Sequence, residues 1–397
     1  MEENLLTKAK RDWLLKIVFS VIVYTITFTV VLKLTSEAYM GSDYSAHVHW
    51  AEQLHRANMI SYFQEYPYFM WHLTVRIFYK IFGMPMNYAA AVVSALVNVV
   101  VYLITAEIIK RYKVDKSGVI SFCLMLVGPL YMPWFNPNYY VGQSTPNTWH
   151  NPTNLMVKPF AVCCFFIILR VLTDIRNEKK IKGSLWAVLS VLIFLSVLAK
   201  PSFCQGIIPG LGVYLIFICI KDRFRNIKQY ICLCLTFVPG VFLMLNQVLL
   251  YWGKDGIRGT IGISWLDVLS YYTPNAYISM LLSYCFPLLY LVLNWKKVLE
   301  RTDIQFGICY MAMAWLEAAL LYESVGKYNG NFGWASLLAS FILWIIITIC
   351  FCEDIHHFRM DDKMLLIKNT VLIIVFSIHL LCGCWYAYNM MVGPIGL

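Results

Sequence analysis

The stretch GSDYSAHVHW, residues 41–50, carries one acidic residue and two histidines within ten positions. The carboxylate of Asp43 could act as a general base and remove a proton from an attacking hydroxyl group. His47 follows one helical turn later and could orient that carboxylate, whereas His49 would point to another face. The alternative is that Ser42 or Asp43 caps a surface helix by accepting a backbone N–H bond. We predict that Asp43 and His47 are catalytic.

A single carboxylate is enough for one particular class of reaction. When a sugar is transferred from a phosphate, the phosphate leaves as a stable anion and needs no proton. Glycoside hydrolysis usually needs a second carboxylic acid to protonate the leaving group. A lone Asp43 therefore favours transfer from a phosphate-activated sugar.

Basic and histidine side chains near the ends of the hydrophobic segments form a second group of candidates. Lys200 lies in AKPSF, and Arg258 lies between two glycines with a guanidinium group that matches phosphate oxygens. Each also has a structural explanation. The lysines could extend their ammonium groups from lipid to water, and Arg258 could be a charged residue in a flexible loop. The histidines could belong to an interfacial aromatic belt. A mostly cationic set favours an anionic substrate such as a lipid phosphate. The predicted substrate-binding residues are His72, His150, Lys158, Lys200, Arg258 and Lys327.

The composition is that of a membrane protein. Of the 397 residues, 60% are hydrophobic and 14% are charged, whereas about a quarter of an ordinary soluble domain is charged. Hydrophobic runs of about 20 residues, each long enough to cross a bilayer, recur along the whole chain. We predict an all-α polytopic membrane protein with about eleven transmembrane helices. The predicted spans are 13–34, 88–109, 117–135, 155–172, 184–199, 202–220, 229–252, 276–294, 304–322, 332–352 and 365–391.

The net charge of +10 reflects the predicted topology and does not indicate nucleic-acid binding. Lysine and arginine collect in every second connection, and the positive-inside rule places these connections in the cytoplasm. The N-terminus is then cytoplasmic, and an odd number of spans puts the C-terminus and the active face on the extracytoplasmic side of the cell membrane. The basic residues are Lys8, Lys10 and Arg11 before the first span, then Lys110, Arg111, Lys113, Lys116, Arg176, Lys179, Lys180, Lys182, Lys221, Arg223, Arg225, Lys228, Lys296, Lys297 and Arg301.

We predict one transmembrane domain over residues 1–397, with no soluble domain. Its longest extracytoplasmic connection, 35–87, begins with GSDYSAHVHW, whose apolar residues recur every four positions as in a helix along the membrane surface. The segment 66–83 is amphipathic but is interrupted by His72 and two basic residues, so we expect a second interfacial or re-entrant helix. The remaining outer connections are rich in Gly, Pro and Asn and are predicted to be loops: 136–154, 199–203, 253–275 and 322–334.

We expect neither a metal site nor a cofactor. The outer connections offer no pair of acidic residues to hold Mg²⁺ or Mn²⁺ through oxygen ligands. The cysteine and histidine spacings do not match a zinc site.

The motif SDY at 42–44 follows the first span, and YP follows at 66–67. With a surface helix after the acid, a long outer loop and cations outside, the chain resembles the GT-C class of integral membrane glycosyltransferases. In that class the acid of the first outer loop is the proposed general base, and the donor is a sugar on polyprenyl phosphate. The resemblance therefore implies that Asp43 is the base. It also implies an acceptor hydroxyl on a cell-envelope glycan or a lipid-linked acceptor.

The chain departs from that class in two ways. Many members carry another acid in the second outer loop, but residues 136–154 contain none. The first loop also has no DxD pair, so the metal-dependent oligosaccharyl-transfer variety is not expected.

Two other functional classes use similar substrates. A polysaccharide polymerase or ligase usually depends on arginines in large outer loops, and only Arg258 fits that pattern. A lipid-linked-glycan transporter, or flippase, needs polar residues through the middle of the membrane, and apart from Glu317 and scattered Asn and Gln the predicted spans lack them. A cavity open only outward and sideways to lipid favours a transferase, whereas one that crosses the bilayer favours transport.

Overall fold

The computed structural model describes residues 2–36, 42–55, 58–137, 145–147, 149–252, 259–356 and 363–393. In these ranges the fold is all-α apart from one two-stranded sheet. The helices of the first half are α1 (Glu2–Leu34), α2 (Asp43–Gln53), α3 (Met59–Glu65), α4 (Met70–Phe82), α5 (Met86–Arg111), α6 (Ser117–Leu126), α7 (Pro152–Arg176), α8 (Gly183–Ala199) and α9 (Ser202–Lys221).

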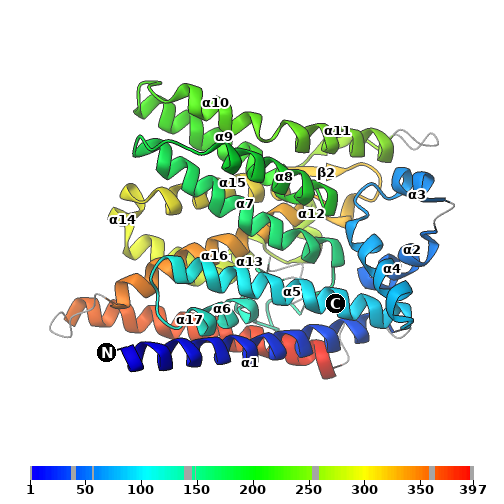
Figure 1. The fold of residues 1–397 in the computed structure, drawn as a ribbon, viewed down its shortest axis with the longest axis horizontal. Helices are drawn as coiled ribbons and strands as arrows, with labels where there is room; N and C mark the ends of the chain where they lie inside the picture. Colours follow the sequence, from blue (N-terminus) through cyan, green and yellow to red (C-terminus); the bar gives the residue numbers. More distant parts are fainter. Residues whose placement is uncertain are drawn as a thin grey trace.

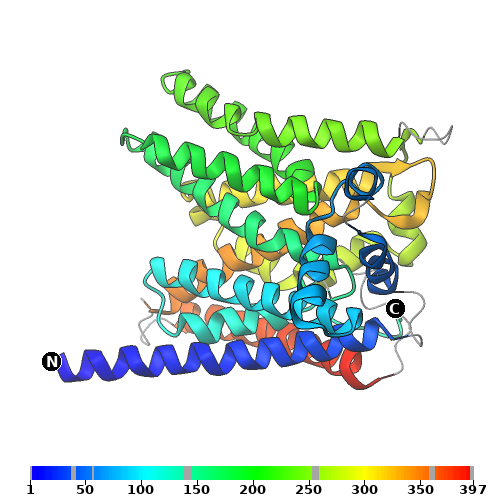
Figure 2. The ribbon, with the colours of Figure 1, turned by 45° about the vertical axis from the view of Figure 1, so that its right-hand side comes forward.

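The second half continues the helical bundle. Figure 1 shows α1, α5, α6 and α17 along one side of the bundle and α10 and α11 along the opposite side, and Figure 2 gives the same order. Between them, α16 is almost fully buried. The helices are α10 (Ile227–Leu235), α11 (Val238–Trp252), α12 (Asp267–Tyr272), α13 (Ala276–Leu293), α14 (Trp295–Glu300), α15 (Thr302–Leu320), α16 (Gly333–His356) and α17 (Lys363–Val392), with the 3-10 turn η3 (Lys327–Asn329).

Seven of the described helices are long and apolar enough to cross a membrane, namely α1, α5, α7, α9, α13, α16 and α17. The pair α10 and α11, bent by 41°, would make an eighth, and α6 and α8 are shorter apolar helices. With α15, every predicted span contains a helix. The chain is thus a multi-pass helical membrane protein, while eleven crossings remain a prediction.

The third predicted span, 117–135, does not continue as a helix to its end, because α6 ends at Leu126. Pro129 cannot donate a helical hydrogen bond and disfavours the helical conformation of the residue before it. The non-helical chain packs on α17, where His379 donates from Nδ1 to the carbonyl oxygen of the glycine that precedes the proline, over 2.7 Å. At Gly383 the two backbones are so close that a Cβ would lie 1.7 Å from the carbonyl oxygen of Leu126.

The described part of the segment 35–87 contains α2, α3 and α4, so a helix is present at both places where one was predicted, and α3 is additional. Ser94 of α5 fixes two of them. Its hydroxyl oxygen accepts from the hydroxyl of Tyr44 over 3.1 Å and from the indole N–H of Trp71 over 3.2 Å. The aromatic side chains of α2 and α4 are thereby held against the membrane bundle.

Two predicted loops contain short strands instead. Strand β1 (Ile261–Ile263) runs antiparallel to β2 (Leu321–Glu323), with Ile261 opposite Glu323. The expectation that 253–275 and 322–334 are irregular is therefore wrong at β1, β2 and α12. Strand partners this far apart in sequence leave no local pattern by which to recognise a strand of three residues.

Candidate functional site

Asp43 is the first residue of α2, but Ser42 caps this helix. The Ser42 hydroxyl oxygen accepts from the backbone N–H of Tyr44 over 3.2 Å. The partly buried carboxylate of Asp43 instead accepts a hydrogen bond from the side-chain amide of Asn151, with 2.7 Å between Nδ2 and Oδ2. Of the two capping candidates, Ser42 thus makes the cap, and the Asp43 side chain points to another element.

Asn151 is the N-cap of α7, and it is not among the residues predicted from the sequence. Its Oδ1 accepts from the backbone N–H of Asn154 over 2.8 Å and from the Thr153 hydroxyl over 2.9 Å. The same oxygen accepts from the ammonium group of Lys200 over 3.1 Å. The sequence TWHNPTN does contain a signal for a cap, because Asn precedes a Pro at the first helical position. That signal predicts a helix start and not a contact with Asp43.

Lys200 follows α8 directly, at the turn into α9. Its backbone is extended, as the residue before a proline requires. The side chain is buried, with Nζ 4.1 Å from the ring centroid of Trp334 at the start of α16. Burial lowers the pKa of Lys200 to about 7, while the negative charge of Asp43 acts in the opposite direction. The ammonium group is thus near its titration point at neutral pH, and a bound anion would favour the charged form.

His150 lies beside Trp334, the same ring that the Lys200 ammonium group contacts. Its ring centroid is 5.8 Å from that of Trp334. Burial lowers the pKa of His150 to about 4, Asp43 raises it and Lys200 lowers it further. The charges of Asp43 and Lys200 therefore both act on His150, and the imidazole is neutral at pH 7.

His47 and His72 form a stacked pair between α2 and α4. The distance from His47 Nδ1 to His72 Nε2 is 2.8 Å, and the ring planes differ by 22°. Burial holds the pKa of His47 well below its usual value and that of His72 at about 3, so one neutral ring donates to the other. Lys200 also lowers the pKa of His47, which indicates that the pair borders the Asp43 cluster. The hydrogen bond that orients Asp43 comes from Asn151, whereas we expected that partner in His47.

The other predicted cations have separate partners. Lys158 does not extend to water, because it is 1% exposed and its Nζ donates to the carbonyl oxygen of Pro146 over 3.1 Å and to Oδ1 of Asn147 over 3.3 Å. It thereby holds the chain that precedes α7. Lys327 forms an ion pair with Asp267 of α12. Arg258 lies outside the described residues.

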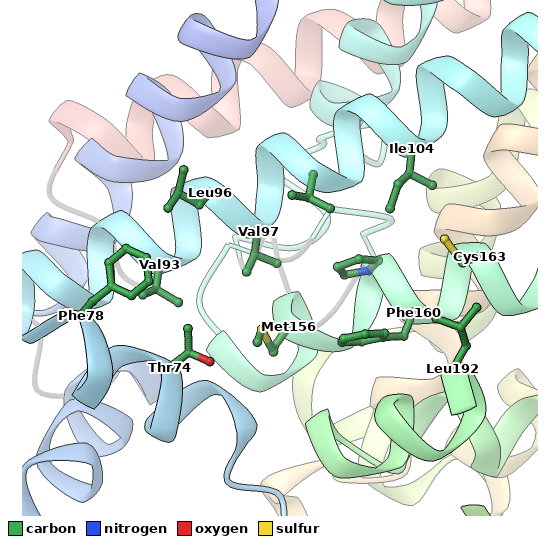
Figure 3. Close-up of a pocket in the computed structure, with 12 residues that line it drawn as sticks. Thr74, Phe78, Val93, Leu96, Val97, Ile104, Met156, Phe160, Cys163 and Leu192 are labelled. Atoms are coloured by element: carbon green, nitrogen blue, oxygen red, sulfur yellow. The ribbon is translucent and has the colours of Figure 1, made fainter. Parts of the chain in front are cut away.

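An apolar groove of about 360 Å³ lies between α4, α5, α7 and α8 (Figure 3). Side chains such as Phe78, Val97 and Met156 line it, and its Thr74 hydroxyl donates to the backbone of its own helix. Leu96 is 41% exposed, so the groove opens on the outer surface of the bundle, which would face lipid in a membrane. Because an α-helix rises 1.5 Å per residue, Met156 lies only about 7.5 Å along α7 from Asn151.

No family model matches the chain, and no curated protein sequence matches it. Within the described ranges, no group of three or more His, Cys, Asp or Glu side chains is arranged to hold a metal ion. The features that bear on function are the polar cluster of Asp43, His150, Asn151 and Lys200 and the apolar groove near it.

Proposed function

We propose that this protein is a membrane glycosyltransferase with a GT-C-like fold. It moves a sugar from a polyprenyl-phosphate donor to a hydroxyl of a cell-envelope glycan or a lipid-linked acceptor on the extracytoplasmic face. One observation carries the proposal: a carboxylate that does not cap its helix is joined through Asn151 to a buried lysine, near an apolar groove that opens on the outer surface of the bundle.

In the proposed reaction, Asp43 accepts the proton of the acceptor hydroxyl as its oxygen attacks the anomeric carbon of the sugar. The bond between that carbon and the phosphate oxygen breaks, and polyprenyl phosphate leaves with the bonding electrons. A charged Lys200 stabilises the negative charge that develops on the phosphate. This single displacement inverts the configuration at the anomeric carbon and needs no second carboxylic acid.

The groove fits the lipid part of such a donor. A phosphate beside Lys200 would leave its polyprenyl chain on the membrane side of the cluster, where the groove begins. The groove wall is apolar, as an isoprenoid chain requires, and α7 and α8 contribute both to the wall and to the cluster. Neutral His150 and Trp334 beside the ammonium group are suited to a sugar, through hydrogen bonds and ring contacts.

The test is turnover by the purified protein in lipid nanodiscs with a panel of polyprenyl-phosphate sugars and an Asp43→Asn control. We expect one donor to give polyprenyl phosphate and a glycosylated product with inverted configuration, and the control to be inactive. Chain elongation without dependence on Asp43 would favour the polymerase or ligase alternative. Movement of a lipid-linked glycan across vesicles without any product would favour the flippase.

A further inference from the structure

Asn151 contacts both charged groups of the cluster through opposite ends of one amide. Nδ2 donates to Oδ2 of Asp43 over 2.7 Å, and Oδ1 accepts from Nζ of Lys200 over 3.1 Å. The orientation of the amide is fixed by its partners, because a carboxylate only accepts and an ammonium group only donates. Asn151 is also buried and capped onto α7, so the amide itself has little freedom to move.

A neutral bridge at this position has a chemical consequence. If Asp43 and Lys200 paired directly, the carboxylate would be a weaker base and the ammonium group would be less available to a phosphate. In the described part of the chain, Asp43 and Lys200 form no ion pair with each other, and the Asn151 amide hydrogen-bonds to both. We infer, on the basis of the proposed function, that Asn151 is a positioning residue that aims the Asp43 carboxylate and separates it from Lys200.

Two substitutions separate this role from helix capping. In Asn151→Ser the cap is kept, because Ser caps a helix about as well as Asn, but the shorter side chain loses the amide that reaches Asp43. In Asn151→Asp the cap is kept again, but two carboxylates face each other. The matched control is Asn275→Ser, since Asn275 caps α13 by accepting from Tyr277 and Ile278 and is exposed.

The measurements are kcat, the KM for the polyprenyl-phosphate sugar, the pH profile and thermal stability in detergent. For Asn151→Ser we expect an about hundredfold loss of kcat, as misplacement of a reacting group by about 1 Å can cause. For Asn151→Asp the acidic limb of the pH profile should move to higher pH, because a second negative charge favours protonation of Asp43. Asn275→Ser should leave kcat and the profile unchanged.

If Asn151→Ser keeps the wild-type kcat and Asn151→Asp leaves the pH profile unshifted, Asn151 serves only as a helix cap and the inference is wrong. If Asn151→Ser loses stability, the profile of Asn151→Asp decides alone. Asp43→Asn distinguishes a failure of the positioning role from a failure of the proposed function. An inactive Asp43→Asn with normal Asn151 variants rejects only the positioning role, whereas an active Asp43→Asn rejects the proposed base and its positioning residue together.

Discussion

Asp43 occupies a position where structural and chemical roles are easily confused, since an acidic residue in the first turn of a helix often has a purely structural purpose. Here the neighbouring Ser42 accepts the hydrogen bond from the helix N-terminus, and the Asp43 carboxylate is held by a residue from α7. Its chemistry can therefore be removed without removing the cap. This separation makes the role of a single carboxylate testable.

We predict that Asp43→Asn and Asp43→Ala both lower turnover by about a hundred- to ten-thousand-fold, the usual contribution of general-base catalysis. Neither should lose a cap, because Ser42 provides it. Ser42→Ala is the comparison for stability and should cost about 1 kcal/mol. Initial rates and thermal unfolding in detergent measure both effects. An Asp43→Asn protein with normal turnover would contradict the proposed base.

The buried ammonium group of Lys200 predicts a pH dependence of donor binding. Its pKa of about 7 means that it is mostly charged below pH 7 and mostly neutral above, whereas a donor phosphodiester keeps its negative charge throughout this range. Donor affinity should therefore be full at pH 6 and fall by up to about tenfold per pH unit above 7, because one pKa unit corresponds to one factor of ten. Binding titrations between pH 6 and 9 measure the dependence.

The matched variant for this prediction is Lys200→Ala. It should bind the donor weakly at every pH in the range, since it cannot carry the charge. A wild-type affinity that stays constant from pH 6 to 9, or the same pH dependence in Lys200→Ala, would show that another group binds the phosphate.

At the scale of elements, apolar length and turn chemistry predict the helices well, because a membrane helix satisfies its own backbone and needs no distant partner. These local patterns do not predict a helix end or a strand that depends on contact with a distant part of the chain. The end of α6 follows from Pro129 and the close approach of α17, and β1 depends on β2. In the candidate site, the carboxylate of Asp43 and the ammonium group of Lys200 can be recognised as candidates from their residue types alone. Asn151 cannot, because it contacts Asp43 only where α7 begins beside α2.

The groove between α4, α5, α7 and α8 gives a prediction about chain length. Val97→Trp should fill part of it and raise the KM for a long-chain polyprenyl donor by about tenfold, within the range by which apolar pockets discriminate. The KM for a donor with one or two isoprene units should hardly change. Leu103→Trp is the control, because Leu103 is on α5 and exposed on the surface of the bundle but does not line the groove. An equal effect on both donors in Val97→Trp would exclude the groove as the lipid site.

At the scale of the whole molecule, the bundle has two chemically different ends. Asp43, Asn151 and Lys200 lie at the end that also holds α2, α3 and α4, whereas the N-terminus lies at the opposite end (Figure 1). The Lys33 ammonium group, at the C-terminal end of α1, donates a hydrogen bond to the backbone carbonyl oxygen of Gly393 after α17. The C-terminal ends of α1 and α17 therefore meet at the same end of the bundle as the Asp43 cluster. The positive-inside rule assigns the end with the basic connections to the cytoplasm.

This assignment predicts the accessibility of introduced cysteines in intact cells. Gln64 on α3 and Lys179 after α7 are both exposed on the protein, but α7 alone, 25 residues long, spans about 38 Å between the site and the connection with Lys179. Gln64→Cys should react with a membrane-impermeant thiol reagent from outside, and Lys179→Cys should react only after the membrane is permeabilised. The unmodified chain gives the background, since it contains thirteen cysteines. Labelling of Lys179→Cys in intact cells, with Gln64→Cys protected, would place the Asp43 cluster in the cytoplasm and the basic connections outside, against the positive-inside rule. An extracytoplasmic acceptor could then not reach the proposed base.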